Sequence, residues 1–343
     1  MSLSRALKPA AEARITRTTS KLKLIPSMNT IQTPPSTLVH IGVDVCAAWL
    51  DIHGLPRPER VANTATGHAR LIKQLQRLPE AAHVILEASG GYEHALWLAL
   101  LRTGIATSRV NPARVRHFAK AHGILAKTDK IDAALLARFG QQVQPACDVL
   151  PHDWELQLRE LSDRRLQLVS MRAQQMVQKK QLRDKRLVKS AASLLKTLER
   201  HIAMLDKQIA ALLGKGEAQA KAMRLRQMGG VGRTVSATLL SELPELGKVN
   251  DSRLSSLAGL APHPQDSGPL KGTRHIQGGR QKVRRVLYMA ALHCVRHNTI
   301  LKAFYQNLIK RGKPFKVAIT AVMRKLLCVL NKLASTPTFQ LAN

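Results

Sequence analysis

Hydrophobic and polar residues alternate where the ordered part of this chain begins. Between Val39 and Val45, valine and isoleucine alternate with His40, Gly42 and Asp44, which is the period of a β-strand. Further strands are predicted at 49–52, at the apolar segment 84–86 and at 105–110, and helices at 66–78, at 92–103 and up to residue 140. Strands that alternate with helices predict an α/β domain built on a mostly parallel sheet.

The second half of the chain has a helical pattern. No strand signal occurs between Trp154 and Leu225, and apolar residues at 198, 202, 205, 209 and 212 are spaced as in a coiled-coil seam of about two heptads. A Gly-Val-Gly turn, Gly230 to Gly232, lies between two helical segments and resembles a helix-hairpin-helix element, whose backbone amides meet a DNA phosphate without reading sequence. An ordinary helix connection fits the same residues. Two further helices are predicted at 281–298 and 315–334.

These patterns predict four segments. Residues 1–38 mix Arg, Lys, Ser, Thr and Pro with one acid. This composition fits a disordered basic arm, or a segment that results from assigning a start codon upstream of the true one. The other three are a catalytic α/β domain (39–145), a helical, coiled-coil linker (146–225) and a mostly α-helical C-terminal domain (226–343).

The charge of the chain points to a polyanionic partner. Lys and Arg number 54 against 22 Asp and Glu, a formal charge of +32, and such an excess repels itself unless a polyanion lies against it. Nucleic acid is the expected partner, and residues 226–343, with 19 basic and 4 acidic residues, are its expected main binder. A membrane partner is not expected, because no apolar run approaches the ~20 residues of a spanning helix.

The four cysteines are scattered, without a CxxC pair, which is typical of reduced residues in a cytoplasmic protein and not of disulfides or a zinc site. Aromatic residues make up only 3% of the chain, which argues against base stacking as its main means of binding.

Four acidic residues are candidates for chemistry. Asp44 lies in the middle of an otherwise apolar strand, where a carboxylate is costly to desolvate without a compensating positive charge. Glu87 ends a predicted strand, where open α/β sheets place their sites. Asp129 and Asp132 start a helix three residues apart and share a face. Together they suit a site with two Mg²⁺ ions for phosphoryl transfer. Helix capping by Asp129 and Asp132, and an Arg partner for Glu87, explain the same residues without a metal.

Several blocks then resemble one family. These blocks are residues 42–45 (GVDV), 87–93 (EASGGYE), 110–119 (VNPARVRHFA), 125–133 (LAKTDKIDA), 257–262 (LAGLAP), 266–268 (DSG), 278–280 (GGR) and 287–292 (LYMAAL). In this order and at these intervals they resemble the DEDD transposases of the one-ten family of bacterial insertion sequences. The resemblance covers residues 39 to about 335, which makes it far more specific than any single motif.

The resemblance implies a RuvC-like, RNase H-type fold for residues 39–145 and a metal-binding tetrad of Asp44, Glu87, Asp129 and Asp132, holding two Mg²⁺ or Mn²⁺ ions. It implies that Ser267 is the nucleophile and forms a covalent link to DNA. It also implies that a structured RNA encoded by the element guides donor and target DNA, and that subunits of a homo-oligomer, a dimer or tetramer, share the active site. Residues expected to contact nucleic acid are Gly230, Gly232, Lys271, Arg274, Arg280, Lys282, Arg284 and Arg285.

Two other functions fit the residues. A metal-dependent nuclease such as a junction resolvase would use water as its nucleophile, and Ser267 would then be an ordinary turn serine in the loop from Pro262 to Gly272. A non-catalytic nucleic-acid-binding protein would use the acids only for capping and pairing.

Overall fold

The computed structural model describes residues 38–57, 59–124, 129–263, 274–336 and 338–339. The chain forms two compact units, Met1–Leu150 and Pro151–Asn343. The second unit contains most of the segment predicted as a linker (146–225) together with the predicted C-terminal domain (226–343), so the separation of these two segments stays a prediction. The predicted basic arm lies outside the described residues, apart from Leu38.

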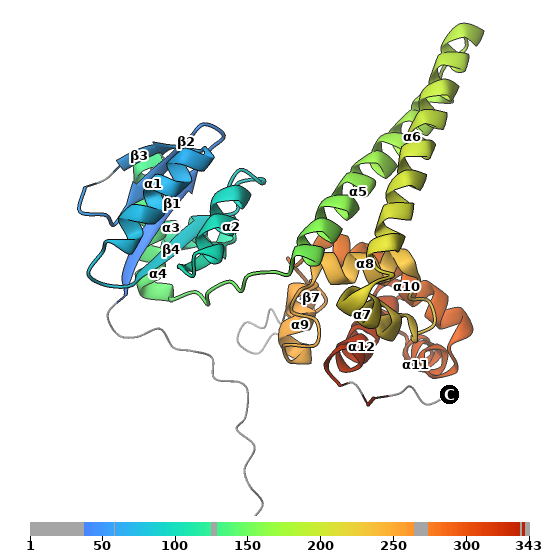
Figure 1. Ribbon diagram of the computed structural model, residues 1–343. Coiled ribbons are helices and arrows are strands. Elements are labelled where there is room, and N and C mark those ends of the chain that lie inside the picture. Colours follow the sequence, from blue (N-terminus) through green and yellow to red (C-terminus); the bar gives the residue numbers. More distant parts are fainter. Residues whose placement is uncertain (1–37, 58, 125–128, 264–273, 337, 340–343) are drawn as a thin grey trace, which may run out of the picture. The chain divides into compact units, whose positions relative to one another are not determined.

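A five-stranded sheet forms the centre of the first unit (Figure 1). Its strands are β1 (Val39–Val45), β2 (Trp49–His53), β3 (Glu59–Ala62), β4 (Ala82–Glu87) and β5 (Ala106–Val110), in the order β3-β2-β1-β4-β5. β1, β4 and β5 are parallel, whereas β1, β2 and β3 pair antiparallel. The sheet is therefore mixed and not mostly parallel as predicted, because the short β1–β2 and β2–β3 connections can join only antiparallel strands.

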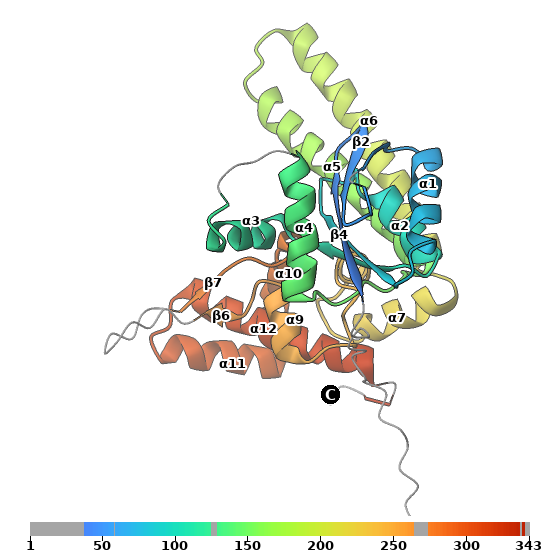
Figure 2. The same ribbon diagram turned by 90° about the vertical axis from the view of Figure 1, so that its left-hand side faces the viewer.

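Helices cover both faces of this sheet. They are α1 (Ala65–Gln76), α2 (His94–Arg102), α3 (Pro112–Ala121) and α4 (Asp129–Val143). α1 and α2 lie on one face, and α3 and α4 lie on the other (Figure 2). Local sequence explains where α1 and α3 begin: the side chains of Thr64 and Asn111 accept hydrogen bonds from the first-turn amides of Gly67 and Ala113. β4 is apolar on both faces because helices cover both, and Val84, Ile85 and Leu86 are fully buried; in β1 the apolar face carries the fully buried Ile41 and Val43.

The second unit begins with a long helical hairpin of α5 (Asp153–Lys179) and α6 (Lys185–Leu212) (Figure 1). The predicted seam on α6 is confirmed, because Leu198 and Leu205 pack with Leu168 of α5 in a buried cluster. α5 of the same chain therefore covers this stretch of the seam.

The remainder of this unit is helical around one large core. Its elements are α7 (Gly216–Arg226), α8 (Arg233–Glu242), α9 (Asp251–Leu257), α10 (Gln281–His297), α11 (Thr299–Lys310) and α12 (Phe315–Ser335), with a two-stranded sheet of β6 (Pro262–His263) and β7 (His275–Ile276) between α9 and α10. α12 contributes Leu326, Leu327 and Leu330, all fully buried. None of the described helices is long and apolar enough to cross a membrane.

Candidate metal centre

The parallel strands β1 and β4 bring two of the predicted acids to one edge of the sheet. Val43 of β1 pairs with Leu86 of β4, so Asp44 and Glu87, each one residue further along, occupy neighbouring positions at the carboxyl ends of their strands. Residues at matched positions of paired strands project from the same face. Asp44 and Glu87 are both half-buried. The sheet therefore holds these two carboxylates next to each other, although 43 positions separate them in the sequence.

A glycine in β1 brings α4 against this edge. A Cβ atom at Gly42 would lie 2.0 Å from the carbonyl oxygen of Ala133 and 2.4 Å from the amide nitrogen of Ala137, so the helix backbone lies directly on the strand. Only glycine permits so close an approach. Gly42 and Asp44 are two residues apart and project from the same face of the sheet, so Asp44 lies on the face that α4 covers.

The direction of α4 places its first turn at the same edge. Gly140, near the end of α4, packs against His40 and Ile85, whereas Ala133 packs against Gly42, which lies further along β1 than His40. The helix thus runs antiparallel to β1, and its first residue, Asp129, begins it on the side where β1 and β4 end. Asp132, which is half-buried, precedes Leu136 by one turn, and Leu136 is the residue whose Cβ approaches Gly42.

The backbone thus brings the elements of all four predicted acids to one edge, and oxygen ligands of this kind suit Mg²⁺. Among the described residues, no three His, Cys, Asp or Glu side chains form a group that could hold a metal ion, and the side chain of Asp129 is not one of those described. Asp44, Glu87 and Asp132 each interact with another group. Their role as metal ligands stays a prediction that rests on the placement of their elements.

A further acid, Asp51 of β2, lies beside Asp44 on the neighbouring strand and was not predicted as part of the site. It is paired directly with Asp44 across the strands, is only 8% exposed, and receives two hydrogen bonds of 2.9 Å from the guanidinium of Arg60 on β3. A bidentate Arg–carboxylate pair occupies both oxygens, so Asp51 is neutralised beside Asp44. The alternation in β2 offered no sign of this, because an acid and its partner from the next strand meet only in the folded sheet.

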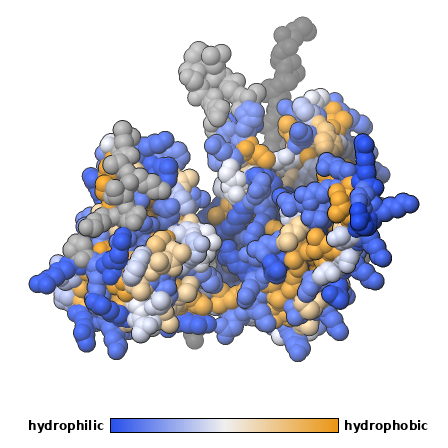
Figure 3. All heavy atoms as spheres, turned by 90° about the horizontal axis from the view of Figure 1, so that it is seen from above, coloured by the Kyte–Doolittle hydropathy of each residue, from blue (hydrophilic) through white to orange (hydrophobic). Residues whose placement is uncertain are grey.

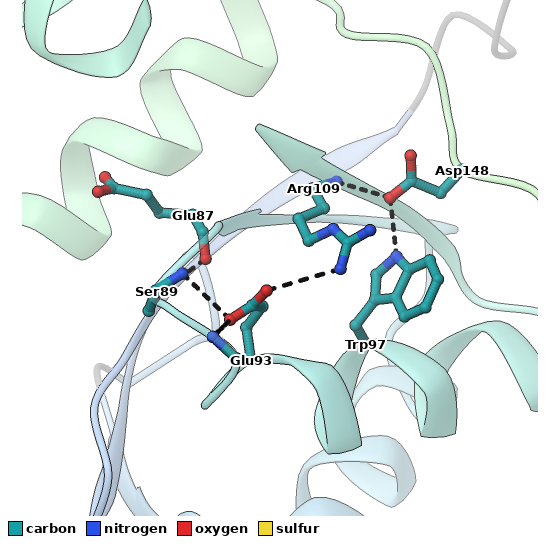
Figure 4. Close-up of polar contacts among 7 residues, drawn as sticks. Glu87, Ser89, Glu93, Trp97, Arg109 and Asp148 are labelled. Atoms are coloured by element: carbon teal, nitrogen blue, oxygen red, sulfur yellow. Dashed lines mark hydrogen bonds and ion pairs between the residues drawn. The ribbon is translucent and has the colours of Figure 1, made fainter. Parts of the chain in front are cut away.

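The loop that follows Glu87 is held by a buried glutamate (Figure 4). Glu93 is 4% exposed, and one of its carboxylate oxygens accepts hydrogen bonds from the amides of Ser89 (3.1 Å) and Gly91 (2.9 Å). The other oxygen lies 3.6 Å from the guanidinium of Arg109, which stacks over the Trp97 ring at 4.3 Å. Figure 4 shows the Glu87 carboxylate directed away from this cluster. Glu93 therefore fixes the conformation of the loop, and the carboxylate of Glu87 points away from the Glu93 cluster.

The predicted nucleophile, Ser267, lies outside the described residues, but the segments that flank it are described. β6 and β7 pair antiparallel, with Pro262 opposite Ile276 and His263 opposite His275. This pairing brings together the two ends of the loop that carries Ser267. The motif blocks around it pack against each other, because the amide of Arg280 donates a 2.8 Å hydrogen bond to the carbonyl of Leu257.

Three of the predicted nucleic-acid contacts have partners inside the protein. Arg280 forms an ion pair with Glu245. Burial raises the pKa of Glu245, but the hydrogen bond and the charge of Arg280, together with a backbone hydrogen bond and the charge of Lys248, lower it below its usual value. Lys282 binds Asp163 and Glu242, and Arg284 donates to the carbonyls of Gly259 and Gly278. These three cations hold the fold together. A contact with nucleic acid stays a prediction for them.

The other predicted contacts are more open. Arg274 and Arg285 are exposed, and Lys271 lies outside the described residues. Gly230 and Gly232 lie in the turn between α7 and α8, so the predicted turn between two helices is confirmed, whereas its role as a helix-hairpin-helix element stays a prediction. Gly230 has φ +87°, and a Cβ there would press on the carbonyl of Ala290, whereas a Cβ at Gly232 would meet nothing within 4 Å. Gly230 is thus required by the fold, and Gly232 leaves the start of α8 open.

Comparison with known proteins agrees with this architecture. Residues 43–185 match the family model of the IS110 DEDD transposases, and residues 222–306 match that of the transposase IS116/IS110/IS902 family. The pilin gene-inverting proteins of Moraxella lacunata and Moraxella bovis are each 30% identical over 315 residues, covering 84% of this chain and 94% of theirs. An insertion element IS110 uncharacterized 43.6 kDa protein of Streptomyces coelicolor is 30% identical over 155 residues, 45% of this chain and 38% of that protein.

The chain is therefore an enzyme of the transposase and DNA recombinase class, which transfers DNA strands. It belongs to the IS110 family of DEDD transposases. The family acts on DNA and uses divalent metal ions. All four predicted acids fall within the first matched stretch, and Ser267 falls within the second. The interpretation as a non-catalytic binding protein is thereby wrong.

Proposed function

We propose that this chain is an insertion-sequence transposase that cuts and rejoins DNA at the edge of a RuvC-like, RNase H-type sheet. The observation that carries the proposal is the contact of α4 with β1 at Gly42, which sets the helix bearing Asp129 and Asp132 beside the strand ends that bear Asp44 and Glu87. Four carboxylates gathered at this edge would repel one another, and a divalent cation between them would remove that repulsion.

Asp44, Glu87, Asp129 and Asp132 would hold two Mg²⁺ ions, and Mn²⁺ would serve as a substitute. When bound, these ions polarise the scissile phosphate and stabilise the attacking and leaving oxygens. The buried Asp51 with its partner Arg60, and Glu93 with its loop, would hold the acids in position.

The hydroxyl oxygen of Ser267 attacks the phosphorus of a DNA phosphodiester. A bond forms between the serine oxygen and phosphorus, the bond between phosphorus and the leaving sugar oxygen breaks, and that oxygen gains a proton as the serine hydroxyl loses one. A hydroxyl of a second DNA strand then displaces the serine. Each step exchanges one phosphodiester for another, so rejoining needs no ATP.

A structured RNA encoded by the element would direct donor and target DNA by base pairing, and the protein would read backbone and shape. The excess of 19 basic over 4 acidic residues in 226–343 supports polyanion binding by this part of the chain. The active site would be shared between subunits of a homo-oligomer, with Ser267 of one and the acids of another.

Two substitutions test the chemistry. Asp44→Asn should abolish recombination between the element's ends in cells and weaken Mn²⁺ binding measured by calorimetry, while DNA binding is retained. Glu80→Gln, which removes an exposed acid from the same unit, should change none of these. Unchanged Mn²⁺ affinity in Asp44→Asn would remove Asp44 from the site.

Ser267→Ala should abolish strand cleavage and the covalent protein–DNA adduct seen on denaturing gels. Ser256→Ala, an exposed serine on α9, is the matched control and should leave both unchanged. Cleavage that persists in Ser267→Ala without an adduct would instead support the nuclease that uses water.

A further inference from the structure

The helical unit contains a cavity of about 480 Å³ that lies between α5, α6, α8 and α10. Its apolar lining includes Leu166, Ile209 and Ala237. Charged side chains from five helices also line it, and they are Asp163, Arg165, Asp206, Arg226, Arg233, Glu242, Lys282 and Arg285. All lie in the unit Pro151–Asn343, so the cavity belongs to a single compact body. Its volume is within the range of about 300–1,000 Å³ found for sites that bind small molecules.

Each of the three acids that line this cavity forms an ion pair with a cation of the same cavity. Asp206 accepts two hydrogen bonds from Arg165, at 2.5 and 3.2 Å. Asp163 and Glu242 both bind Lys282, the latter at 2.7 Å. Although burial lowers the pKa of Lys282, its bonds to these two acids raise it above its usual value, so the ammonium remains charged. Arg165 and Lys282 are thus paired with the three acids of the cavity.

Three arginines remain on the cavity wall. Arg226, Arg233 and Arg285 are exposed, and none has a carboxylate within 4.0 Å among the described residues. Arg226 makes only a weak bond of 3.4 Å to the carbonyl of Ala222. The two paired cations and three paired acids together carry a charge of −1. The three arginines add three positive charges, so the cavity has a net charge of +2. An arginine cluster beside an apolar wall matches the two parts of a nucleotide, which are its phosphate and its base.

The start of α8 also borders the cavity. Its first turn, which bears Arg233 and Thr234 on the cavity wall, has no side-chain cap. Free amides at a helix start attract anions. The helix start therefore favours a phosphate-bearing ligand over an apolar one.

We propose that this cavity binds one unpaired nucleotide of a nucleic-acid strand, with its phosphate at Arg226, Arg233 and Arg285 and its base against the wall formed by Leu166, Ile209 and Ala237. This inference rests on the proposed function, because it assumes that a strand is opened or displaced during recombination. A double helix is too wide to enter a cavity of about 480 Å³. The site therefore selects single-stranded segments.

Fluorescence anisotropy of the full chain tests the site, with fluorescein-labelled oligothymidylate, oligouridylate of the same length, and a DNA duplex as probes. Arg233→Gln and Arg285→Gln should each weaken single-strand binding roughly tenfold, because each removes a charge-assisted contact. The double variant should flatten the salt dependence by about 0.7 log units per decade, the contribution of one phosphate on a single strand. The single-stranded probe that loses more affinity identifies DNA or RNA as the source of the nucleotide.

Two further variants separate the cavity from general charge. Arg311→Gln removes an exposed cation of the same unit outside the cavity and should have less than about a twofold effect. Ala210→Leu narrows the cavity from its partly exposed side without changing charge. It should weaken binding of the single strands and leave duplex binding unchanged. Circular dichroism checks that each variant is folded.

The outcomes distinguish this proposal from the function on which it rests. A wild-type chain that binds none of the probes would refute nucleic-acid binding altogether. Wild-type binding that Arg233→Gln and Arg285→Gln reduce no more than Arg311→Gln does would overturn the cavity alone. Equal losses for single strands and duplex, or unchanged binding in Ala210→Leu, would show that no unpaired nucleotide enters.

Discussion

Gly42→Ala should move α4, which bears Asp129 and Asp132, away from the strands that bear the other two acids of the proposed metal site. The added Cβ would lie 2.0 Å from the carbonyl oxygen of Ala133, whereas real Cβ atoms essentially never come within 3.0 Å of such an atom, so α4 must move away from β1 by about 1 Å. Overpacking of this kind costs about 1–3 kcal/mol. A shift of about 1 Å at a reacting centre can lower a rate about 100-fold. We therefore expect both a loss of stability and a nearly complete loss of recombination.

Urea unfolding and a recombination assay on the element's ends measure the two effects, and Gly104→Ala is the control. Gly104 has φ +75° and open space around it, so alanine there costs about 1–2 kcal/mol of backbone strain without moving α4. It should lower stability by a similar amount and leave the rate of recombination per folded molecule unchanged. If Gly42→Ala recombines DNA as well as Gly104→Ala does, the contact of α4 with β1 does not set the active geometry.

Two further predictions concern buried polar groups of the same unit. Glu93→Gln keeps the shape of the side chain but removes the charge beside Arg109, so the free energy of unfolding in urea should fall by about 1–3 kcal/mol; an unchanged midpoint would show that Glu93 does not hold the loop. His83, 1% exposed, bonds Ser108 at 2.8 Å and lies with its ring 5.4 Å from that of His40. Burial, assisted by His40, lowers the pKa of His83 from 6.5 to about 4, and burial also lowers that of His40. The folded state therefore favours the neutral ring, so its stabilising effect is complete above pH 6.5 and is lost as the pH falls toward 4, by up to about 3 kcal/mol. His83→Asn should reduce this pH dependence of urea unfolding, and an equally steep dependence in the variant would assign it to other groups.

The chemical surface of the helical unit was harder to predict than its helices. Arg280, Lys282 and Arg284 all lie near a basic helix, and sequence alone assigned them to nucleic acid. In the folded protein each has a partner from a distant part of the chain, such as Glu245 for Arg280. On the face drawn in Figure 3, hydrophilic side chains are spread widely among hydrophobic ones. A charged residue at the surface therefore does not by itself indicate whether its charge is available. Arg226 and Arg233 are available but were not predicted, because the sequence does not show which basic residues find an acidic partner in the fold.

Local pattern determined the elements themselves. The alternation in β1, the apolar run of β4 and the seam on α6 each reflect a burial face that side chains within a few residues define. β3, β6 and β7 left no such trace. β3 has four residues with only Val61 buried, and β6 and β7 have two residues each, so none is long enough for a period to emerge.

Neighbouring residues thus define most of the strands and helices, and the motif blocks of the sequence pointed to the family and to four acids. Tertiary structure decided that the sheet is mixed, that Gly42 admits α4 to the edge of Asp44 and Glu87, and which arginines remain without an acid. The physical reason is that burial periodicity is a property of neighbouring residues. Pairing, close approach and ion pairing depend on groups tens of residues apart, which meet only when the chain has folded.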